Sequence, residues 1–430
     1  MRVYLETTGC RLNQSEIETL ARQFQQTGHQ VVMSADDADL CVVNTCAVTT
    51  DAERVSRQII RKLNRANPAA EIVATGCYAH LSPQVVGVLP GVAQVVDNFD
   101  KDRLIPLVLK SEVTDVFDHE PLDRDKVAGA SGRTRAFIKV QDGCDNHCTF
   151  CVTTIARGVG RSRPAADVLR EIQALAGAGY QEAVLTGVHL GSYGHDQGEP
   201  DGLLRLARLI LDHTDIPRLR LSSLEPWDLS PDFFRLWENP RLCRHLHLPL
   251  QSGCDTTLKR MARRTSQAAF SALVQAARAQ IPDLAISTDL IVGFPGETDI
   301  DFETSYDFVR HMAFMKLHVF RYSRREGTGA SRMKGQIPES VKKDRSARLL
   351  TLSDQGAQAF FAQFAGREMD VLWEQIAGAA PDGFYNSGLT DNYIRVDMTA
   401  PAVLTNTITR VRLSAVTGRG LSAEWAAAAR

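Results

Sequence analysis

The sequence has 430 residues, of which 44% are apolar and 23% are charged, and its formal net charge is −2. These values are typical of a folded globular protein, and a chain of this length is too long for one core, so we expect about three domains. The balanced charge gives no global sign of a nucleic-acid binder, and no run of about 18 apolar residues predicts a membrane partner. The N-terminus has no apolar signal segment, so we expect a cytoplasmic protein whose nine cysteines stay reduced for metal binding or catalysis.

Residues 1–110 predict alternating strands and helices. Apolar strands are expected at residues 3–6, 40–43 and 72–74. Helices are expected to begin at Ser15 and Thr50, because each is followed three residues later by a glutamate, as in a capping box. This alternation predicts a parallel sheet covered by helices, a three-layer α/β domain.

A cysteine follows each of these three strands: Cys10, Cys46 and Cys77. Ligands bind at the carboxyl edge of a parallel sheet, where three thiols brought together would hold an iron-sulfur cluster with one open iron. Each cysteine alone is more often a small buried apolar residue, but the same position in three successive units favours a shared site. Cys41, Cys243 and Cys254 show no such pattern and are expected in the core or in loops.

A tighter cysteine motif, CxxxCxxC, spans Cys144, Cys148 and Cys151. Three thiolates within eight residues can bind three corners of one [4Fe-4S] cube, which leaves the fourth iron open. The alternative is a zinc knuckle that includes His147. Zinc requires four closed ligands, and the flanking cysteines would crowd this histidine out of the tetrahedron, so the spacing favours the cluster.

This motif, placed after an apolar strand at residues 136–140, resembles the signature of radical S-adenosylmethionine (SAM) enzymes. The resemblance implies that the open iron binds SAM and that an electron from the cluster generates a 5'-deoxyadenosyl radical. Cys10 after Thr-Thr-Gly, Cys46 after Asn-Thr and Cys77 after Thr-Gly narrow the resemblance to the methylthiotransferases. That family implies a second [4Fe-4S] cluster that supplies or carries sulfur, and the resemblance covers essentially the whole chain.

Residues 111–132 are rich in acids and predict a linker between the N-terminal domain and a radical SAM domain at residues 133–365. The expected architecture of the second domain is a partial (βα)6 barrel, with active-site loops at the carboxyl ends of its strands. Six apolar strands are expected there, at residues 136–140, 183–186, 219–222, 245–248, 285–292 and 315–320.

Loops after four of these strands are similar to the SAM-binding motifs of the family. A glycine after the second strand would approach the SAM amino group, an amide and a hydroxyl after the fourth would bond the ribose, and an aromatic ring after the sixth would contact adenine. The alternative for the Gly-Phe-Pro-Gly stretch is a simple turn. The residues implied are Gly187, Gln251, Ser252, Gly293, Glu297 and Tyr322.

Two basic stretches suggest binding of an anion. Arg157, with Arg161 and Arg163, could hold an anionic substrate, although a solvated face is the simpler interpretation. The second stretch is a plausible track for RNA phosphates. It comprises Arg324, Arg325, Arg332, Lys334, Lys342, Lys343, Arg345 and Arg348.

Residues 366–430 change to short β-type runs and predict a small OB-like barrel that resembles the RNA-binding TRAM domain. Four aromatic residues there either stack on RNA bases or form the barrel core. These are Trp373, Phe384, Tyr385 and Tyr393.

The resemblance implies a tRNA methylthiotransferase that acts at the anticodon loop, with a reductant such as flavodoxin or ferredoxin and a sulfur donor. The Ser-Ser-Leu-Glu-Pro stretch at residues 222–226 resembles the branch that acts on N6-threonylcarbamoyladenosine at tRNA position 37. Donors at the barrel mouth would suit the carboxylate and hydroxyl of that base. Alternatives are isopentenyladenosine, a ribosomal protein aspartate, or a non-catalytic iron-sulfur electron-transfer or RNA-binding protein. The candidate substrate residues are Arg157, Arg220, Ser222, Ser223 and Glu225, although Arg220 could instead pair with Glu225.

Overall fold

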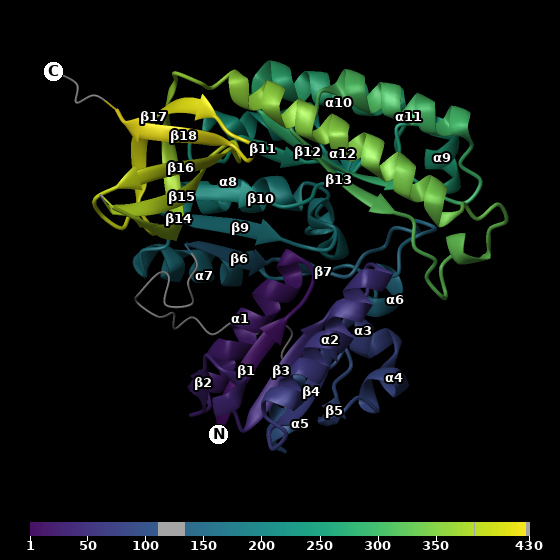
Figure 1. Cartoon of the computed structure of the whole chain (residues 1–430), viewed down its shortest axis with the longest axis vertical. Coiled ribbons are helices and arrows are strands. Elements are labelled where there is room, and N and C mark those ends of the chain that lie inside the picture. Colours follow the sequence, from purple (N-terminus) through teal and green to yellow (C-terminus); the bar gives the residue numbers. More distant parts are fainter. Residues whose placement is uncertain (111–133, 382, 427–430) are drawn as a thin grey trace.

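The computed structural model describes residues 1–110, 134–381 and 383–426. The molecule has three parts: an N-terminal sheet with its helices, a central barrel and a terminal barrel. An N-terminal sheet and its helices lie below a central barrel, and a small second barrel lies at the C-terminal end (Figure 1). The expected linker at residues 111–132 lies outside the described residues. No helix in the described part of the chain has the length and apolar character needed to cross a membrane.

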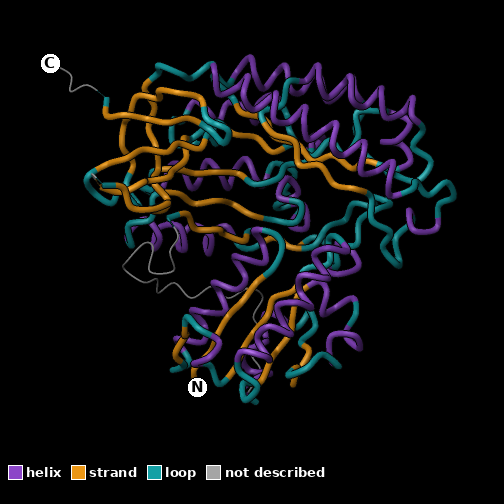
Figure 2. Tube along the Cα trace, viewed as in Figure 1, coloured by secondary structure: helices purple, strands orange, loops and turns teal. Residues whose placement is uncertain are grey.

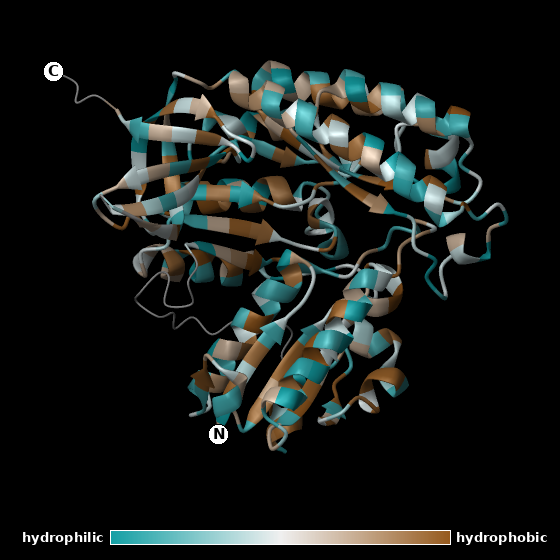
Figure 3. Ribbon diagram, in the orientation of Figure 1, coloured by the Kyte–Doolittle hydropathy of each residue, from teal (hydrophilic) through white to brown (hydrophobic). Residues whose placement is uncertain are grey.

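The N-terminal part is a parallel sheet in the order β2-β1-β3-β4-β5, packed between helices. Figure 3 shows the hydrophobic residues gathered on its central strands. The two outer strands were not expected, because they are short and partly exposed and so lack a continuous apolar run. The strands are β1 (Arg2–Thr7), β2 (Gln30–Val32), β3 (Leu40–Thr45), β4 (Glu71–Gly76) and β5 (Val92–Val95); the helices are α1 (Arg11–Gln26), α2 (Thr50–Ala66), α3 (Cys77–Leu81), α4 (Pro83–Gly87) and α5 (Leu104–Leu109).

The helix starts differ from the two expected capping boxes. Helix α1 begins four residues earlier, at Arg11, so Ser15 lies inside it, and the Ser15 hydroxyl donates a hydrogen bond to the Phe137 carbonyl of the central barrel at 2.8 Å. Helix α2 begins at Thr50, but its cap is Thr49, whose hydroxyl accepts from the Ala52 N–H at 3.1 Å. Ser15 is therefore not a helix cap. Its hydroxyl bonds a strand that is distant in the sequence, and the local sequence pattern does not predict that contact.

The central part is an open parallel barrel, which confirms the partial-barrel prediction. In the described chain, β6-β9-β10 and β11-β12-β13 form two parallel halves, and bridges from Leu219 to Leu242 and from Ser223 to His247 join them. Helices cover the outer side of these strands (Figure 2). The strands are β6 (Arg135–Lys139), β9 (Glu182–Thr186), β10 (Arg218–Leu221), β11 (His245–His247), β12 (Ala285–Val292) and β13 (Lys316–Arg321); the longer helices are α7 (Ala165–Gly177), α8 (Gly202–His213), α10 (Gln267–Gln280), α11 (Asp299–Met312) and α12 (Glu339–Ala362).

Short elements surround the cysteine loop between β6 and α7. A small antiparallel pair, β7 (Gln141–Asp142) and β8 (Arg161–Ser162), closes the loop, and helix α6 (Thr153–Arg157) follows its last cysteine. Helix α9 (Asp255–Arg260) lies nearby, because the Thr149 N–H donates to the carbonyl of Met261, the residue that ends α9. Backbone hydrogen bonds therefore hold the loop at its base, through β7 and β8, and at Thr149 within it.

The C-terminal part is a closed barrel of the strands β14-β15-β16-β18-β17, as the OB-like prediction requires. Its core contains Trp373, which is fully buried and donates its indole N–H to Thr409 at 2.7 Å. Trp373 is therefore a core residue and is not available for base stacking, whereas Tyr385 is 46% exposed. The strands are β14 (Glu368–Ala380), β15 (Gly383–Thr390), β16 (Arg395–Ala400), β17 (Ile408–Val416) and β18 (Leu421–Trp425).

The turn between β15 and β16 joins the two barrels. Tyr393 in this turn stacks on His245 of β11, with ring centroids 4.6 Å apart, and lies over the Arg220 guanidinium at 4.7 Å. Its hydroxyl accepts a hydrogen bond from Arg11 of the N-terminal part at 2.9 Å. Tyr393 therefore packs between all three parts of the molecule and does not offer its ring to an RNA base.

Buried charges join the N-terminal part to the central barrel. The Arg157 guanidinium donates to Glu16 at 2.8 Å, to Asp142 at 2.9 Å and to Asn13 at 2.9 Å, and Lys101 reaches Glu16 at 2.7 Å. Burial would raise the pKa of Glu16, but Arg157 and Lys101 outweigh it and hold that pKa well below its usual range. The expected role of Arg157 as an anion-binding residue is wrong on this geometry, because the protein's own acids already surround it.

We predict that Arg157→Met weakens the junction between these two parts. The change leaves Glu16 and Asp142 without the guanidinium, and breaking a buried ion pair costs about 3–5 kcal/mol. Urea unfolding should report this loss, whereas Arg54→Gln, which breaks an exposed pair with Asp51 on α2, should change stability little. Equal stability of both variants would contradict the structural role of Arg157.

Candidate active site

A cavity of about 1350 Å³ extends between the three parts of the molecule. Its walls come from the loops after β1, β3 and β4, from the interior of the central barrel, from α12 and from the terminal barrel. In the described chain no strand pairing joins β6 to β13, and the cavity includes Lys316 and Phe320 of the edge strand β13. The opening of the partial barrel thus gives access from outside to residues at the strand ends.

The three N-terminal cysteines line this cavity together. Their strands β1, β3 and β4 are neighbours in the sheet, so the chain delivers Cys10, Cys46 and Cys77 to one edge. Gly9, at φ +98°, allows the close approach, because a Cβ there would lie 2.5 Å from the Cys46 sulfur. The edge therefore holds three thiols in contact with the same space, as the sequence pattern predicts.

The protein around Cys10 and Cys46 favours the protonated form of these two thiols when no metal is bound. Burial raises the pKa of Cys46 to about 11 and also raises that of Cys10, although Arg157 opposes the shift in both. Cys10 is exposed to the cavity, although the cavity walls remove much of the bulk water around its sulfur. A thiol must lose its proton to bind a metal. A bound cation would then stabilise the negative charge of the thiolate, which the surrounding protein does not.

The CxxxCxxC loop presents its sulfurs next to backbone and side-chain donors. The Asn146 N–H donates to Cys144 at 3.4 Å, the Thr153 N–H to Cys151 at 3.3 Å, and Arg263 to Cys148 at 3.7 Å. Donors at sulfur suit thiolate ligands of an anionic cluster, so the donor set fits a [4Fe-4S] cube. Within the described ranges, no three His, Cys, Asp or Glu side chains converge as they would around one metal ion; a cube is less demanding, since each thiolate binds a different iron.

Arg263 is a site residue that the sequence did not reveal. It is buried, donates to Glu225 at 2.9 Å and to the Pro249 carbonyl at 2.6 Å, and stacks on Trp227 at 4.6 Å, besides its contact with Cys148. Glu225, a candidate substrate residue, lines the cavity but is held by this guanidinium. The Ser-Ser-Leu-Glu-Pro stretch therefore supports the cluster loop through Arg263.

His189 is a second supporting residue near the loop. Its ring bonds Asp228 at 2.6 Å and lies 3.3 Å from the Asn146 amide, which follows Cys144 by two residues. Burial lowers the pKa of His189, but the hydrogen bonds to Asp228 and Cys144 outweigh it and raise the pKa to about 10. A cationic imidazole therefore stands beside the first cysteine of the motif.

The expected SAM-binding residues fall into two groups. Gly187 and Gln251 line the cavity, and Ser252 is buried beside it, where its hydroxyl accepts from the Cys254 N–H at 3.2 Å. The other three, Gly293, Glu297 and Tyr322, are not among the lining residues.

The second group packs as a turn against α12. The Glu297 carboxylate accepts from the Gly293 N–H at 3.0 Å and pairs with Arg345 at 2.5 Å. Tyr322 is buried, with its ring edge-on to Phe294 at 5.4 Å. This arrangement is the simple turn that the sequence left open as the alternative, so contact of these three residues with SAM stays a prediction.

Arg220 does not lie at the barrel mouth. It is fully buried inside the barrel and pairs with Glu182 at 2.7 Å, while it donates to the Asp391 carbonyl of the terminal barrel at 3.0 Å. Both the substrate role and the alternative pairing with Glu225 are therefore wrong. Ser222 and Ser223 do line the cavity, and the buried Ser222 hydroxyl has no hydrogen-bond partner among the described residues.

Four of the eight cations in the expected phosphate track are paired with neighbouring acids. Lys342 is buried and donates to Glu339 at 2.7 Å, and Arg345 pairs with Glu297 and with Asp299. In addition, Arg348 pairs with Glu303 and Arg325 with Glu53. Because these cations stabilise the packing of α12 and the junction with α2, the prediction of a free basic track along this segment is wrong for them.

Comparison with known proteins adds to this geometry. The Radical SAM superfamily matches residues 138–309, and the Uncharacterized protein family UPF0004 matches residues 2–96. The radical SAM methyltransferase TsrM from Kitasatospora setae has a similar fold, with a TM-score of 0.59 at 15% identity over 77% of each chain. The fold and the cysteine loop define a radical SAM enzyme, a class that uses SAM and a [4Fe-4S] cluster.

Three relatives cover most of the chain. The threonylcarbamoyladenosine tRNA methylthiotransferase MtaB of Bacillus subtilis is 36% identical, over 96% of this chain and 93% of its own. MtaB of Thermotoga maritima is 40% identical over 86% of each. The tRNA-2-methylthio-N(6)-dimethylallyladenosine synthase of Acetivibrio thermocellus is 33% identical, over 96% of this chain and 88% of its own. The chain belongs to the family of tRNA methylthiotransferases.

We predict that Arg263→Lys impairs the loop that carries Cys144, Cys148 and Cys151. A lysine ammonium does not reproduce the forked contact with Glu225 together with the bonds to Pro249 and Cys148. Loss of a supporting contact of this kind typically costs about 10- to 100-fold in metal affinity or activity. Iron content after anaerobic reconstitution and the rate of SAM cleavage should both fall.

The control for this experiment is Arg264→Lys. Arg264 is exposed and lies over the same Trp227 ring at 5.7 Å. This variant should retain wild-type iron content and SAM cleavage. A loss of equal size in both variants would assign the effect to the indole contact and not to the cysteine loop.

Proposed function

We propose that this enzyme converts N6-threonylcarbamoyladenosine at position 37 of tRNA to its 2-methylthio derivative. The observation that carries the proposal is the single cavity that joins the three N-terminal cysteines to the open side of the central barrel. A methylthio transfer needs a sulfur source and a radical site that reach the same base. The two MtaB relatives, named for this substrate, support the choice.

The N-terminal trio is proposed to hold a second [4Fe-4S] cluster through Cys10, Cys46 and Cys77. When both clusters and SAM are bound, the cluster of the CxxxCxxC loop and SAM supply the radical chemistry at carbon, and the N-terminal cluster supplies or carries sulfur. The chain's contribution is position, because Arg157 lies at the junction and its charge acts on both Cys10 and Cys46. Its bonds to Glu16 and Asp142 hold the N-terminal edge against the loop.

The terminal barrel is proposed to guide the anticodon loop into the cavity. The cavity wall includes Tyr385 of β15, Arg395 of β16 and Arg419 of the turn between β17 and β18, and Tyr385 and Arg419 are exposed. An exposed ring and nearby guanidinium groups suit stacking on bases and contact with phosphates. We place the RNA-binding surface on this rim and not along α12.

The reaction as proposed also needs partners. A reductant such as flavodoxin or ferredoxin would supply electrons to the CxxxCxxC cluster, and a sulfur donor would restore the N-terminal cluster after turnover. The reductant and the sulfur donor are both expected in the cytoplasm, where we propose that this enzyme acts. The competing substrate is isopentenyladenosine, which the name of the Acetivibrio relative supports.

We predict that the anaerobically reconstituted protein binds two [4Fe-4S] clusters, about eight irons per chain. Replacement of Cys144, Cys148 and Cys151 by Ala should halve the iron content and abolish SAM cleavage. Replacement of Cys10, Cys46 and Cys77 should halve the iron content but leave SAM cleavage in place. Full iron content in the N-terminal triple variant would contradict the second cluster.

We predict that turnover is restricted to tRNA that carries N6-threonylcarbamoyladenosine. Matched anticodon stem-loops with this base, with isopentenyladenosine or with unmodified adenosine should be compared, together with ribosomal protein, by mass spectrometry of the product. Only the first should gain a methylthio group at an appreciable rate. Comparable turnover of a competitor would reject this substrate and leave the methylthiotransferase class in place.

A further inference from the structure

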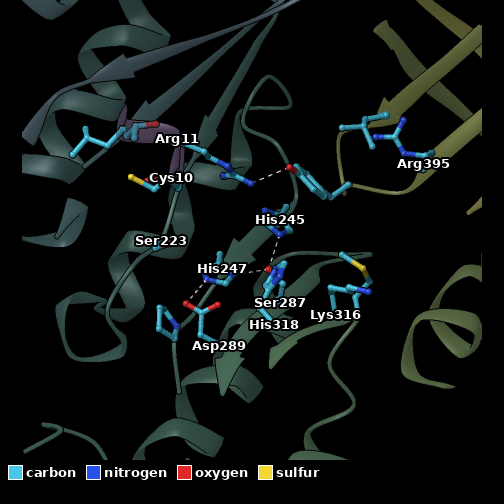
Figure 4. Close-up of a pocket in the computed structure, with 18 of the residues that line it drawn as sticks. Cys10, Arg11, Ser223, His245, His247, Ser287, Asp289, Lys316, His318 and Arg395 are labelled. Atoms are coloured by element: carbon cyan, nitrogen blue, oxygen red, sulfur yellow. Dashed lines mark hydrogen bonds and ion pairs between the residues drawn. The ribbon is translucent and has the colours of Figure 1, made fainter. Parts of the chain in front are cut away.

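The interior of the cavity contains a polar cluster that the proposed chemistry does not use. Figure 4 shows His245, His247, Ser287 and Asp289 linked by dashed interactions below Cys10 and Arg11, with His318 next to Ser287 and Lys316 to one side of this group. All of them line the cavity. The cluster, which we call the barrel-floor site, comprises His245 and His247 of β11, Ser287 and Asp289 of β12, and Lys316 and His318 of β13.

Hydrogen bonds hold one half of the barrel-floor site in place. The Ser287 hydroxyl lies between the His245 ring, at 3.0 Å, and the His247 ring, at 2.9 Å. The second ring nitrogen of His247 reaches the Asp289 carboxylate at 3.3 Å. His245 is 2% exposed, and its Nδ1 has no partner among the described residues. This half is therefore rigid and already engages the site's own carboxylate.

The β13 half of the site presents polar groups without partners. His318 is exposed toward the cavity, with its ring edge-on to His247 at 5.4 Å, and no hydrogen bond of His318 occurs within the described residues. Lys316 has no carboxylate within ion-pair distance in the described ranges, and the guanidinium of Arg11 donates only to Tyr393 there. The charged side chain of β13 without an ion-pair partner among the described residues is therefore Lys316, which lies next to Ser287 in the strand register.

Other acids line the cavity but do not neutralise this charge directly. Glu225 is held by Arg263, and Asp354 and Asp397 lie on α12 and β16 without an ion pair to Lys316 within the described residues. An unpaired ammonium in a partly enclosed site favours an anionic ligand, because the interaction is stronger there than in bulk water.

The substituent of the proposed substrate has the matching chemistry. A threonylcarbamoyl group carries a carboxylate, a hydroxyl and urea N–H and C=O groups, whereas an isopentenyl group has no polar atom. An apolar group would remove water from Lys316 and from the His247–Asp289 pair without replacing its hydrogen bonds. The barrel-floor site therefore favours one substrate and penalises the other.

We propose that the barrel-floor site reads the N6 substituent of the base, with Lys316 bound to the threonyl carboxylate and His318 to the hydroxyl or urea group. This inference rests on the proposed function and names the residues that select its substrate. Lys316 and His318 act as specificity residues on β13, while Ser287 and Asp289 orient the histidine wall behind them.

The experiment measures binding of anticodon stem-loops to the reconstituted holoenzyme by fluorescence polarisation. Three loops are compared: one with N6-threonylcarbamoyladenosine, one with its carboxylate methyl ester, and one with unmodified adenosine. Lys316→Met should weaken binding of the first loop about tenfold or more, the size expected for loss of one charge-assisted hydrogen bond. Binding of the ester and of the unmodified loop should change little.

A matched control is Lys62→Met, which removes one exposed lysine of α2 away from the cavity lining. It should bind every loop as the wild type does, so a general effect of protein charge is separated from recognition. His318→Phe should raise KM for the threonylcarbamoyl loop more than it lowers kcat, because the ring binds the substituent and not the reacting carbon.

The two proposals fail in different ways. If the wild type does not methylthiolate the threonylcarbamoyl loop, the proposed function falls, and this inference with it. If the wild type does so but Lys316→Met binds all three loops as the wild type does, only the barrel-floor inference is overturned. Equal weakening for all three loops would also overturn it, because Lys316 would then contact RNA phosphate.

Discussion

The position of the two cysteine groups depends on one buried ion network. Arg157 lies at the end of α6, a few residues after the CxxxCxxC loop, and bonds Glu16 of α1, whose first residue follows Cys10. A buried charge must be paired, so these side chains accept only the docked arrangement of the two parts. The network thereby fixes the N-terminal sheet edge against the mouth of the central barrel.

A second polar junction sets the opposite end of the cavity. The turn after β15 places Tyr393 against His245 and Arg220, and Asp391 of the same turn pairs with Arg244 at 2.5 Å. The terminal barrel is therefore attached at the amino ends of the central strands. Other residues of the terminal barrel, such as Tyr385 and Arg395, line the cavity. Both junctions use arginine, whose planar fork can serve several acceptors at once.

Together the junctions create one space with distinct chemical regions. Thiols line the N-terminal edge, and histidines with an unpaired lysine line the barrel interior. The cysteines of the CxxxCxxC loop are not among the lining residues, but His189 and Glu225, which support that loop, are. The partial barrel leaves one side open in the described chain, between β6 and β13. In the proposed function, sulfur supply and recognition of the base would share this cavity.

Much of this organisation follows from local pattern. Apolar runs separated by helical segments predict parallel strands, and parallel strands bring residues such as Cys10, Cys46 and Cys77 to one edge whatever the details of packing. The CxxxCxxC spacing is likewise a property of a few consecutive residues. The fold class, the open barrel, the terminal barrel and the family were therefore accessible from sequence.

Only the tertiary structure decided the roles of the charged residues. Arg157, Arg220 and Arg345 resemble surface cations in the sequence, yet their acid partners lie 141, 38 and 48 positions away along the chain. Conversely, Lys316 stands out through the absence of such a partner among the described residues, and Arg263 through its contact with Cys148. Whether a charged residue is buried and paired depends on which distant elements pack together, and the local sequence pattern does not predict that packing.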